Sequence, residues 1–235
     1  MNSTAKLILV PTPISEELPL EPVALQLLKE HCLSEAYGLL VEDHKVGRQR
    51  WLKWGLPREA IDRFVLFNEH TQEKLTPELV VDMKRGKQFF LMSDAGLPAF
   101  CDPGQGLVNA CHQNKITVSA TPFPNSVALA LALSGFSHRE FFFAGFLPAN
   151  SDERKLGLDR LSQVRSTLIL MDTPYRLQAL LKDLAKSGLK SREVFLGTSL
   201  NAPTEKLYRG QLTSLISSVG DLNKVEFVMV VAASH

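Results

Sequence analysis

The chain has 235 residues, of which 45% are hydrophobic and 22% charged, and its formal net charge is +1 at pH 7. That length can bury the core of one large or two small domains, while the near-neutral charge excludes a general attraction to polyanions. No window approaches the roughly 20 uninterrupted apolar residues of a membrane span, and residues 7–10 are too short a run for a signal peptide. We therefore expect a soluble, cytoplasmic protein with no membrane contact.

Short apolar runs alternate with segments of helical period in the first half of the chain. This alternation is typical of βαβ units, in which a helix connects two parallel strands. We predict strands at 6–10, 36–41, 63–67, 88–93 and 116–119, and helices at 22–32, 46–54, 77–85 and 104–113.

The second half begins with a helix and continues with further strands. Residues 121–125, with prolines at positions 122 and 124, interrupt both periods, so we place a domain boundary there. The sequence therefore predicts two α/β domains, 1–121 and 122–235, each with a mostly parallel or mixed sheet flanked by helices. In the second domain we predict helices at 126–134, 153–163 and 175–187, and strands at 140–144, 166–171, 193–198, 206–209 and 226–232.

Two segments that directly follow predicted strands carry the first signs of function. Residues 10–14 place Pro11 and Pro13 at the carboxyl end of the sheet, where open α/β folds bind ligands. Residues 93–98 follow another strand, and Gly96 permits a positive φ and a close approach of the backbone to a ligand. A rigid turn without a ligand is the alternative for the first segment.

Two aspartates in and after the second segment can accept hydrogen bonds from hydroxyl or amino groups. They are Asp94 and Asp102, and the latter precedes Pro103 and Gly104. Because Asp before Pro suits the start of a helix, we expect Asp102 to cap the helix that follows, with Pro103 as its first residue.

These segments resemble the tetrapyrrole-methylase superfamily, and in particular its branch that methylates a ribose 2′-hydroxyl in small-subunit ribosomal RNA. That branch has V-P-T-P-I-G-N after its first strand and S-D-A-G-T-P-x-x-x-D-P-G later, and residues 10–15 and 93–104 match these motifs. Residues 41–45 correspond to its A-E-D-T-R, residues 145–148 to its G-F-L-P and residues 167–177 to its T-L-I-F-Y-E-S-x-x-R-L. Motifs in the same order over nearly the whole chain make the resemblance specific.

The resemblance implies the tetrapyrrole methylase fold, in which two α/β domains have a cofactor cleft between them. It implies S-adenosylmethionine as the cofactor, and this molecule carries its own leaving group, so no metal is implied. Family members associate symmetrically, so we also expect a homodimer.

Carried over position by position, the resemblance implies cofactor contacts from loops in both domains. Most of these contacts would use backbone groups, so the side chains there can vary. The residues are Pro13, Asp94, Gly96, Leu97, Pro98, Asn125, Ser126, Met171, Asp172, Asn201, Ala202, Glu226 and Phe227.

A ribose hydroxyl needs a base or a strong hydrogen-bond acceptor to remove its proton. Four titratable residues follow strands at the expected cleft edge, namely Glu42, Asp43, Glu69 and His70. Glu69 and His70 are the leading candidates because, together with Asn68, they match a family segment that also holds a carboxylate and a histidine. For each residue taken alone, a solvated loop position or a helix cap is the alternative.

Other patterns favour a structural explanation. Residues 48–54 combine Arg48, Arg50 and Lys53 with two tryptophans and could contact RNA phosphates and bases, but we favour a partly buried amphipathic helix. Ser126 lacks a G-x-S-x-G motif, which argues against a hydrolase. The three cysteines are far apart and no His/Cys/Asp cluster has metal-ligand spacing, so we expect reduced thiols and no metal site.

Three functions stay open. The first is methylation of RNA, with ribosomal RNA or a ribosomal subunit as substrate and a ribose oxygen as acceptor. The second is carbon methylation of a tetrapyrrole or another small molecule. The third is a catalytically silent protein that binds the cofactor or RNA, because Leu97 and Phe123 stand where the branch has threonine and glycine.

Overall fold

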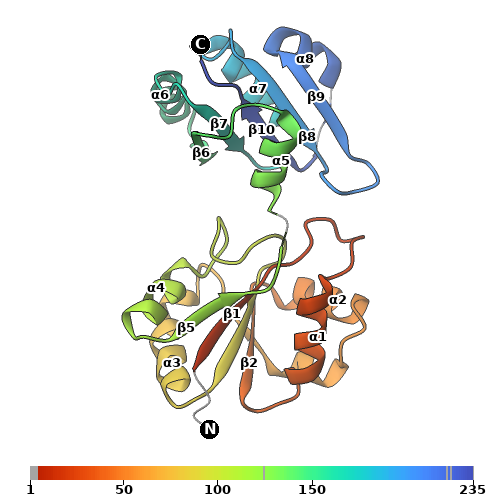
Figure 1. The fold of residues 1–235 in the computed structure, drawn as a ribbon, viewed down its shortest axis with the longest axis vertical. Helices are drawn as coiled ribbons and strands as arrows, with labels where there is room; N and C mark the ends of the chain where they lie inside the picture. The colour runs from red at the N-terminus through yellow and green to blue at the C-terminus, as the bar shows by residue number, and fades with distance from the viewer. Residues whose placement is uncertain (1–4, 124, 221, 223, 235) are drawn as a thin grey trace. The chain divides into compact units, whose positions relative to one another are not determined.

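The computed structural model describes residues 5–123, 125–220, 222 and 224–234 (Figure 1). The chain divides into two compact units, Met1–Phe123 and Pro124–His235, which we call the first and the second unit. Each unit holds a five-stranded sheet flanked by helices, so the predicted α/β class is confirmed. The domain boundary after residue 121 stays a prediction.

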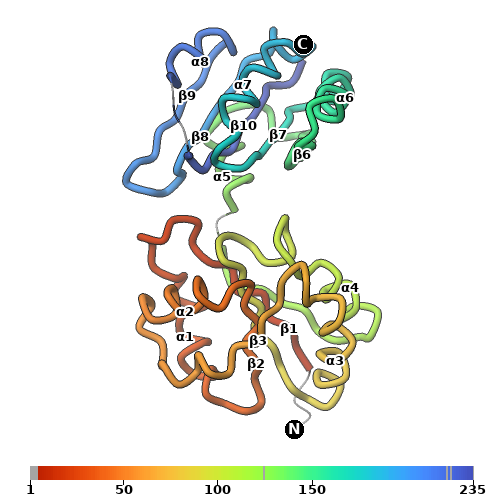
Figure 2. Tube along the Cα trace, turned by 180° about the vertical axis from the view of Figure 1, so that it is seen from behind, coloured from red at the N-terminus to blue at the C-terminus, as the bar shows by residue number. Residues whose placement is uncertain are grey.

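The first unit contains a fully parallel sheet. Its strands are ordered β3-β2-β4-β1-β5, and the edge strand β3 is labelled in Figure 2. The strands are β1 (Lys6–Val10), β2 (Tyr37–Val41), β3 (Phe64–Leu66), β4 (Gln88–Met92) and β5 (Thr117–Ala120). The helices are α1 (Pro22–His31), α2 (His44–Lys53), α3 (Gln72–Lys84) and α4 (Gln105–Gln113), with a 3₁₀ helix η1 (Arg58–Arg63) before β3.

Helices cover both faces of this sheet. One core contains Val10 of β1 and Trp51 of α2, on the side where Figure 1 also shows α1. The other core contains Leu7 of β1 with Met83 of α3 and Leu107 of α4. Because strand side chains alternate between the faces and both faces are buried, the central strands read as continuous apolar runs.

The loops after the parallel strands meet at one edge of the sheet. All five strands run in the same direction, so the chain leaves β1, β2, β3 and β4 at their shared carboxyl end. We call residues 11–15, 42–43, 67–71 and 93–104 the first loop edge.

The second unit contains a mixed sheet, ordered β6-β7-β10-β8-β9. Strands β6 and β7 are parallel, and β10 runs antiparallel to both of its neighbours. The strands are β6 (Phe141–Phe146), β7 (Thr167–Met171), β8 (Glu193–Thr198), β9 (Lys206–Gln211) and β10 (Phe227–Val231). The helices are α5 (Ser126–Ser134), α6 (Ser151–Ser162), α7 (Leu177–Lys186) and α8 (Leu212–Val219).

Helices lie on both faces of the second sheet as well. Leucines of α6, α7 and α8 form one core with the strands, and α5 contacts β8 and β10 from the other side (Figures 1 and 2). The helix predicted at 126–134 is confirmed as α5, and its Val127, Ala130 and Leu131 are buried in the core. Among the described residues, no helix is long and apolar enough to cross a membrane.

The predicted strands are confirmed, with small differences at their ends, and the three cysteines are unpaired as expected. Helix α3 differs because it begins at Gln72, so Pro77 lies inside the helix instead of starting it. Helix α8 was not predicted. It follows β9 directly and has no side-chain cap, so no start signal marks it in the sequence.

Candidate functional site

The loops after β1 and β4 are joined at the first loop edge. Thr12 and Gly96 form an isolated antiparallel bridge, in which each backbone N–H donates to the other residue's carbonyl at 2.9 and 3.0 Å. Thr12 Oγ1 also donates to the Ser93 carbonyl, and Ser93 Oγ donates to the Gly96 carbonyl. The structure therefore brings together the two segments, 10–15 and 93–104, that carry the main motifs.

Two glycines in the loop after β4 adopt backbone angles that favour glycine. Gly96 has a φ of 100° and Gly104 a φ of 130°. A Cβ on Gly104 would lie 2.8 Å from Leu91 Cδ2, so packing also excludes a side chain there. Leu97 and Pro98 continue the turn from Gly96, and Pro98 is buried.

The start of α4 corrects one expectation. The N-cap is Gly104 and the helix begins at Gln105, so the cap predicted for Asp102, with Pro103 as first helical residue, is wrong. The positive φ of Gly104 turns the chain between Pro103 and the helix, which moves the helix start beyond reach of the Asp-Pro signature. Asp102 is consequently available for another role.

Three carboxyl groups influence one another at this edge. Glu42 Oε2 accepts a hydrogen bond from the backbone N–H of Asp94 at 3.0 Å. Burial raises the pKa of Asp94 to about 6, and the charges of Glu42 and Asp43 add to the effect. Burial also raises the pKa of Asp102 to about 7, with further contributions from Glu42 and Asp94. Both aspartates can therefore exchange a proton near neutral pH.

A cavity of about 610 Å³ opens between the start of α3 and residues 101–106. Glu69 and Asp102 both line it, so a leading base candidate lies beside the carboxyl group with the raised pKa. Glu69 Oε1 lies 3.4 Å from His70 Nε2, and the two side chains are 72% and 81% exposed. A substrate can therefore reach both side chains.

The other two base candidates make structural contacts. Asp43 is the N-cap of α2, and its Oδ1 accepts hydrogen bonds from the backbone N–H groups of Lys45 and Val46. The bond from Val46 is the main reason that the pKa of Asp43 is lowered. Glu42 is held by the Asp94 N–H described above. The identity of the base stays a prediction, and Glu69 and His70 have the greater freedom to act.

The basic and aromatic helix of the sequence corresponds to α2, and it is partly buried as we favoured. Trp51 is fully buried and its Nε1 donates to the Pro57 carbonyl at 2.8 Å. Arg50 is also buried, whereas Arg48 and Lys53 are exposed. Only the two exposed cations of this group are therefore accessible to RNA.

In the second unit, predicted cofactor residues gather at one edge of the sheet. Strand β7 ends at Met171 and β8 ends at Thr198, and both ends pair with the start of β10. Ser199 donates its N–H to the Glu226 carbonyl at 2.8 Å. We call residues 147–150, 171–176, 198–202 and 226–227 the second loop edge. It contains Met171 and Asp172, Asn201 and Ala202, and Glu226 and Phe227.

Asn125 and Ser126 lie at the start of α5, a helix that contacts β8 and β10. Asn125 is the N-cap, and its Oδ1 accepts hydrogen bonds from the N–H groups of Val127 and Ala128. Because the side-chain oxygen of Asn125 is used by the helix cap, a ligand would bind the backbone of Asn125 more readily than its side chain. Pro124, in the family's P-G-P position, lies outside the described residues.

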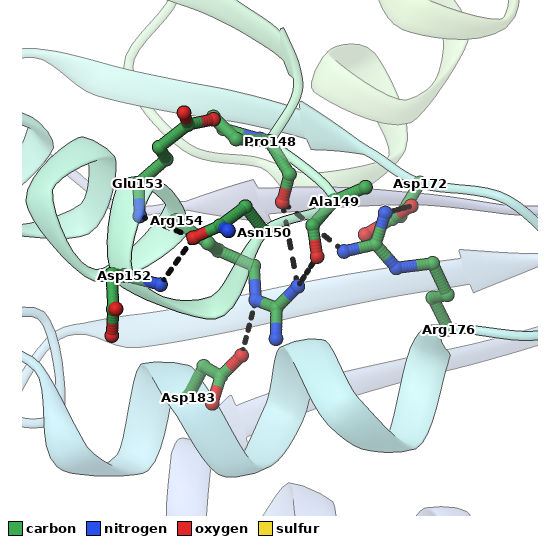
Figure 3. A network of polar contacts seen from close by, with 9 residues as sticks. All are labelled: Pro148, Ala149, Asn150, Asp152, Glu153, Arg154, Asp172, Arg176 and Asp183. Carbon is green, nitrogen blue, oxygen red and sulfur yellow. Dashed lines mark hydrogen bonds and ion pairs between the residues drawn. The ribbon is translucent and has the colours of Figure 1, made fainter.

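A polar network fixes the second loop edge (Figure 3). Arg154 of α6 donates to Asp183 of α7 at 2.6 Å and to the Pro148 carbonyl at 3.4 Å. Arg176 donates to the same carbonyl and forms an ion pair with the buried carboxylate of Asp172. The network joins the G-F-L-P segment to the end of β7, so two motifs that are separate in sequence share one support.

No sequence signal marks Arg154, because a charged residue on a helix is usually solvated. Arg50 could have been recognised from helical spacing. It lies beside Trp51 and four residues before Trp54, so the three share one face of α2 and its continuation.

Comparisons with known proteins identify relatives of this chain. A family model for tetrapyrrole (corrin/porphyrin) methylases matches residues 20–216. The chain is 32% identical over 212 residues to the ribosomal RNA small subunit methyltransferase I of Thermotoga maritima, with 90% of each chain covered. The structure is similar to a diphthine synthase, with a TM-score of 0.69, 12% identity, and 97% and 90% of the two chains covered. It is also similar to the uroporphyrin-III C-methyl transferase from Thermus thermophilus complexed with S-adenosyl homocysteine, with a TM-score of 0.55, 15% identity and 97% of each chain covered.

The two structural likenesses identify the fold as the tetrapyrrole methylase fold. The sequence matches cover most of the chain, and the chain belongs to the tetrapyrrole (corrin/porphyrin) methylase family. It is therefore an enzyme that transfers a methyl group from S-adenosylmethionine.

Proposed function

We propose that this enzyme methylates a ribose 2′-oxygen in RNA of the small ribosomal subunit. The observation that carries the proposal is the 32% identity to the Thermotoga maritima ribosomal RNA small subunit methyltransferase I over 90% of both chains. The structure supports it because the motif segments that follow the strands come together at two loop edges instead of being scattered.

The first loop edge has features that fit S-adenosylmethionine. The nearest atom to a Cβ built on Gly96 is Asp102 Oδ2 at 3.8 Å, so the backbone there leaves room for a ligand. Asp94 and Asp102 can accept hydrogen bonds from amino or hydroxyl groups. Thr121, at the end of β5, has a buried hydroxyl without a hydrogen-bond partner in the described part of the chain. We propose that this edge, together with the predicted residues of the second unit, binds the cofactor.

The chemistry requires the acceptor oxygen to lie in line with the activated methyl group that S-adenosylmethionine supplies. The O–CH₃ bond would form as the S–CH₃ bond of the cofactor breaks, with S-adenosylhomocysteine as the leaving group, and the hydroxyl proton would pass to an acceptor on the protein. Glu69 and His70 are exposed in the loop that follows β3, where they can receive this proton. We propose them as the base, with Glu42 and Asp43 as the alternatives.

The decisive experiment uses small ribosomal subunits from a strain that lacks this enzyme. Pure protein is incubated with these subunits and S-adenosylmethionine that carries a labelled methyl group. A ribose 2′-O-methyl group makes the adjacent phosphodiester resistant to alkali, so label in an alkali-resistant dinucleotide supports the proposal. Label in a copurifying macrocycle would favour carbon methylation of a tetrapyrrole, and cofactor binding without turnover would favour a silent protein.

Cofactor binding should also stabilise the fold, because the cofactor binds the native state only. At about a hundredfold excess over its dissociation constant it would contribute roughly 2.7 kcal/mol. Thermal unfolding with and without S-adenosylmethionine or S-adenosylhomocysteine measures this effect. An unchanged melting temperature at millimolar concentration contradicts the proposed cofactor site.

We further propose that the enzyme is a cytoplasmic homodimer. The family resemblance supports this proposal, since family members associate symmetrically and one subunit can help to shape the substrate face of the other. Light scattering at micromolar protein concentration tests it, and a monomeric mass would refute it.

A further inference from the structure

Arg50 is a charged side chain that is buried beneath the first loop edge. It belongs to α2, and only 8% of its surface is exposed. A guanidinium stays protonated in proteins, so its burial requires hydrogen-bond acceptors or an opposite charge. Desolvation lowers the pKa of Arg50, while the neighbouring carboxylates of Glu16 and Asp94 favour the charged form.

Arg50 is bonded to one of the two loops that carry the main motifs and lines a cavity with the other. Its Nη1 donates to the Pro13 carbonyl at 2.5 Å. The side chain also lines a small, partly open cavity of about 10 Å³, together with Thr12, Ser93 and Asp94. Its Nε is buried and has no hydrogen-bond partner in the part of the chain that the structure describes. A cavity of this size has room for about one water molecule, and Arg50 shares it with residues of both motif loops.

Two other arginines show how this chain satisfies a guanidinium away from the loop edges. Arg63 donates to three backbone carbonyls around the amino end of β2, those of Cys32, Ser34 and Tyr37. Arg192 likewise donates to three backbone carbonyls, those of Val164, Ser166 and Ala232. Arg50 has one carbonyl partner and an unused donor. Structural support alone therefore does not explain its arrangement.

We propose that Arg50 is a positioning residue that holds the Pro13 turn beside the Asp94 carboxylate and thereby sets the affinity for S-adenosylmethionine. The Thr12–Gly96 bridge joins the two loops directly. Arg50 holds the Pro13 turn to α2, and its charge acts on the Asp94 carboxylate of the other loop. The inference rests on the proposed role of Pro13 and Asp94 in binding the cofactor.

The test compares Arg50→Met and Arg50→Lys with the wild-type enzyme. Calorimetric titration with S-adenosylhomocysteine, well below the melting temperature, measures affinity without any acceptor. Arg50→Met removes a charge-assisted hydrogen bond and should weaken binding by about tenfold or more. Arg50→Lys keeps the charge but lacks the planar guanidinium group, so its affinity for S-adenosylhomocysteine should lie between those of the wild type and Arg50→Met. In turnover, the KM for S-adenosylmethionine should rise while kcat stays close to that of the wild type.

Two control variants separate positioning from stability and charge. Arg63→Met removes a guanidinium from the opposite edge of the same sheet and should lower the melting temperature without changing cofactor affinity. Arg48→Met removes a charge from the exposed face of α2 and should change neither. Wild-type affinity in Arg50→Met, or an equal loss of affinity in Arg63→Met, overturns the proposal.

If Arg50→Met does not fold, Arg50→Lys decides the matter. Weakened binding at an unchanged melting temperature supports the proposal, and wild-type binding overturns it. Because these measurements need no acceptor, their outcome does not depend on whether the enzyme methylates RNA. Failure of the positioning role and failure of the proposed substrate are thus distinguishable.

Discussion

The charged groups of the two loop edges differ in how they are buried and paired. At the first, burial and mutual repulsion raise the pKa values of Asp94 and Asp102, and Arg50 keeps an unused donor. At the second, Asp172 and Asp183 are each paired with an arginine that also holds the backbone of the G-F-L-P segment. Asp172 and Asp183 are therefore paired on folding, whereas the first edge retains polar groups that a ligand can use; at the second edge, burial likewise raises the pKa of Glu226.

The largest effect is expected at Glu69 and His70, the accessible pair of the first loop edge, and it would sharpen this comparison. Glu69→Gln or His70→Ala should lower turnover by about a hundredfold to ten-thousandfold if that residue is the base, because the hydroxyl proton loses its acceptor. Single-turnover assays with labelled cofactor measure the rate, and cofactor affinity should persist. Glu73→Gln, which changes another carboxylate of the same cavity, is the matched control. Wild-type rates in both variants would eliminate the assignment and leave catalysis by alignment.

The next effect concerns the backbone of the first edge. Gly96→Val should abolish cofactor binding while leaving a folded protein, because a branched side chain would occupy the space beside the loop. A valine at position 96 would also have to adopt the positive φ of Gly96, which adds strain of about 1–3 kcal/mol. Gly86→Val is the matched control, since Gly86 has nearly the same φ, 98° against 100°, and lies away from the first loop edge. Calorimetric titration compares the two, and tight binding by Gly96→Val would place the cofactor elsewhere.

A smaller effect is expected at the support of the second edge. Arg154→Met leaves Asp183 without its partner, and because that carboxylate is partly exposed the cost should be about 1 kcal/mol. Hydrogen exchange should show faster opening of residues 145–150. Lys155→Met, on the exposed side of α6, should leave exchange unchanged. Exchange in Arg154→Met as slow as in the wild type would show that the network is dispensable.

A separate effect is a change in the pH dependence of stability. The folded state raises the pKa of Asp102 from 3.8 to about 7, so it binds the proton more tightly than the unfolded chain does. Stability from this group is complete below pH 3.8 and is lost as pH rises through about 7. Asp102→Asn mimics the protonated form, so it should melt above the wild type at pH 8, and the difference should shrink steadily as the pH falls towards 3.8. Parallel melting curves across this range would contradict the raised pKa.

The course of the chain could largely be predicted from the sequence. Apolar runs such as β1 and β8 and the capped helix α5 carry their own signals, so their bounds agree with the structure. Parallel strands also imply that the segments around Pro13 and Gly96 meet, because both follow strands at one edge. Helix α8 was not predicted because it is short and has no side-chain N-cap.

The chemistry of the site could be predicted only in part. The Asp-Pro-Gly sequence matched a helix cap at Asp102, but Gly104 is the N-cap and has a φ of 130°, an angle that the local sequence does not specify. The raised pKa values of Asp94 and Asp102 depend first on burial and then on the charge of Glu42, which is distant in the chain, and no local pattern reveals either cause.

The place of β10 in its sheet has a consequence for the synthesis of the protein. This strand lies between β7 and β8 and follows both of them along the chain. Until Phe227–Val231 has been made, the sheet consists of two separate pairs, β6 with β7 and β8 with β9, each with an unpaired apolar edge. A chain that is interrupted before Phe227 would expose both edges to other chains, to chaperones and to proteases. Late errors of translation should therefore lead to aggregation or rapid degradation instead of a slightly shortened enzyme.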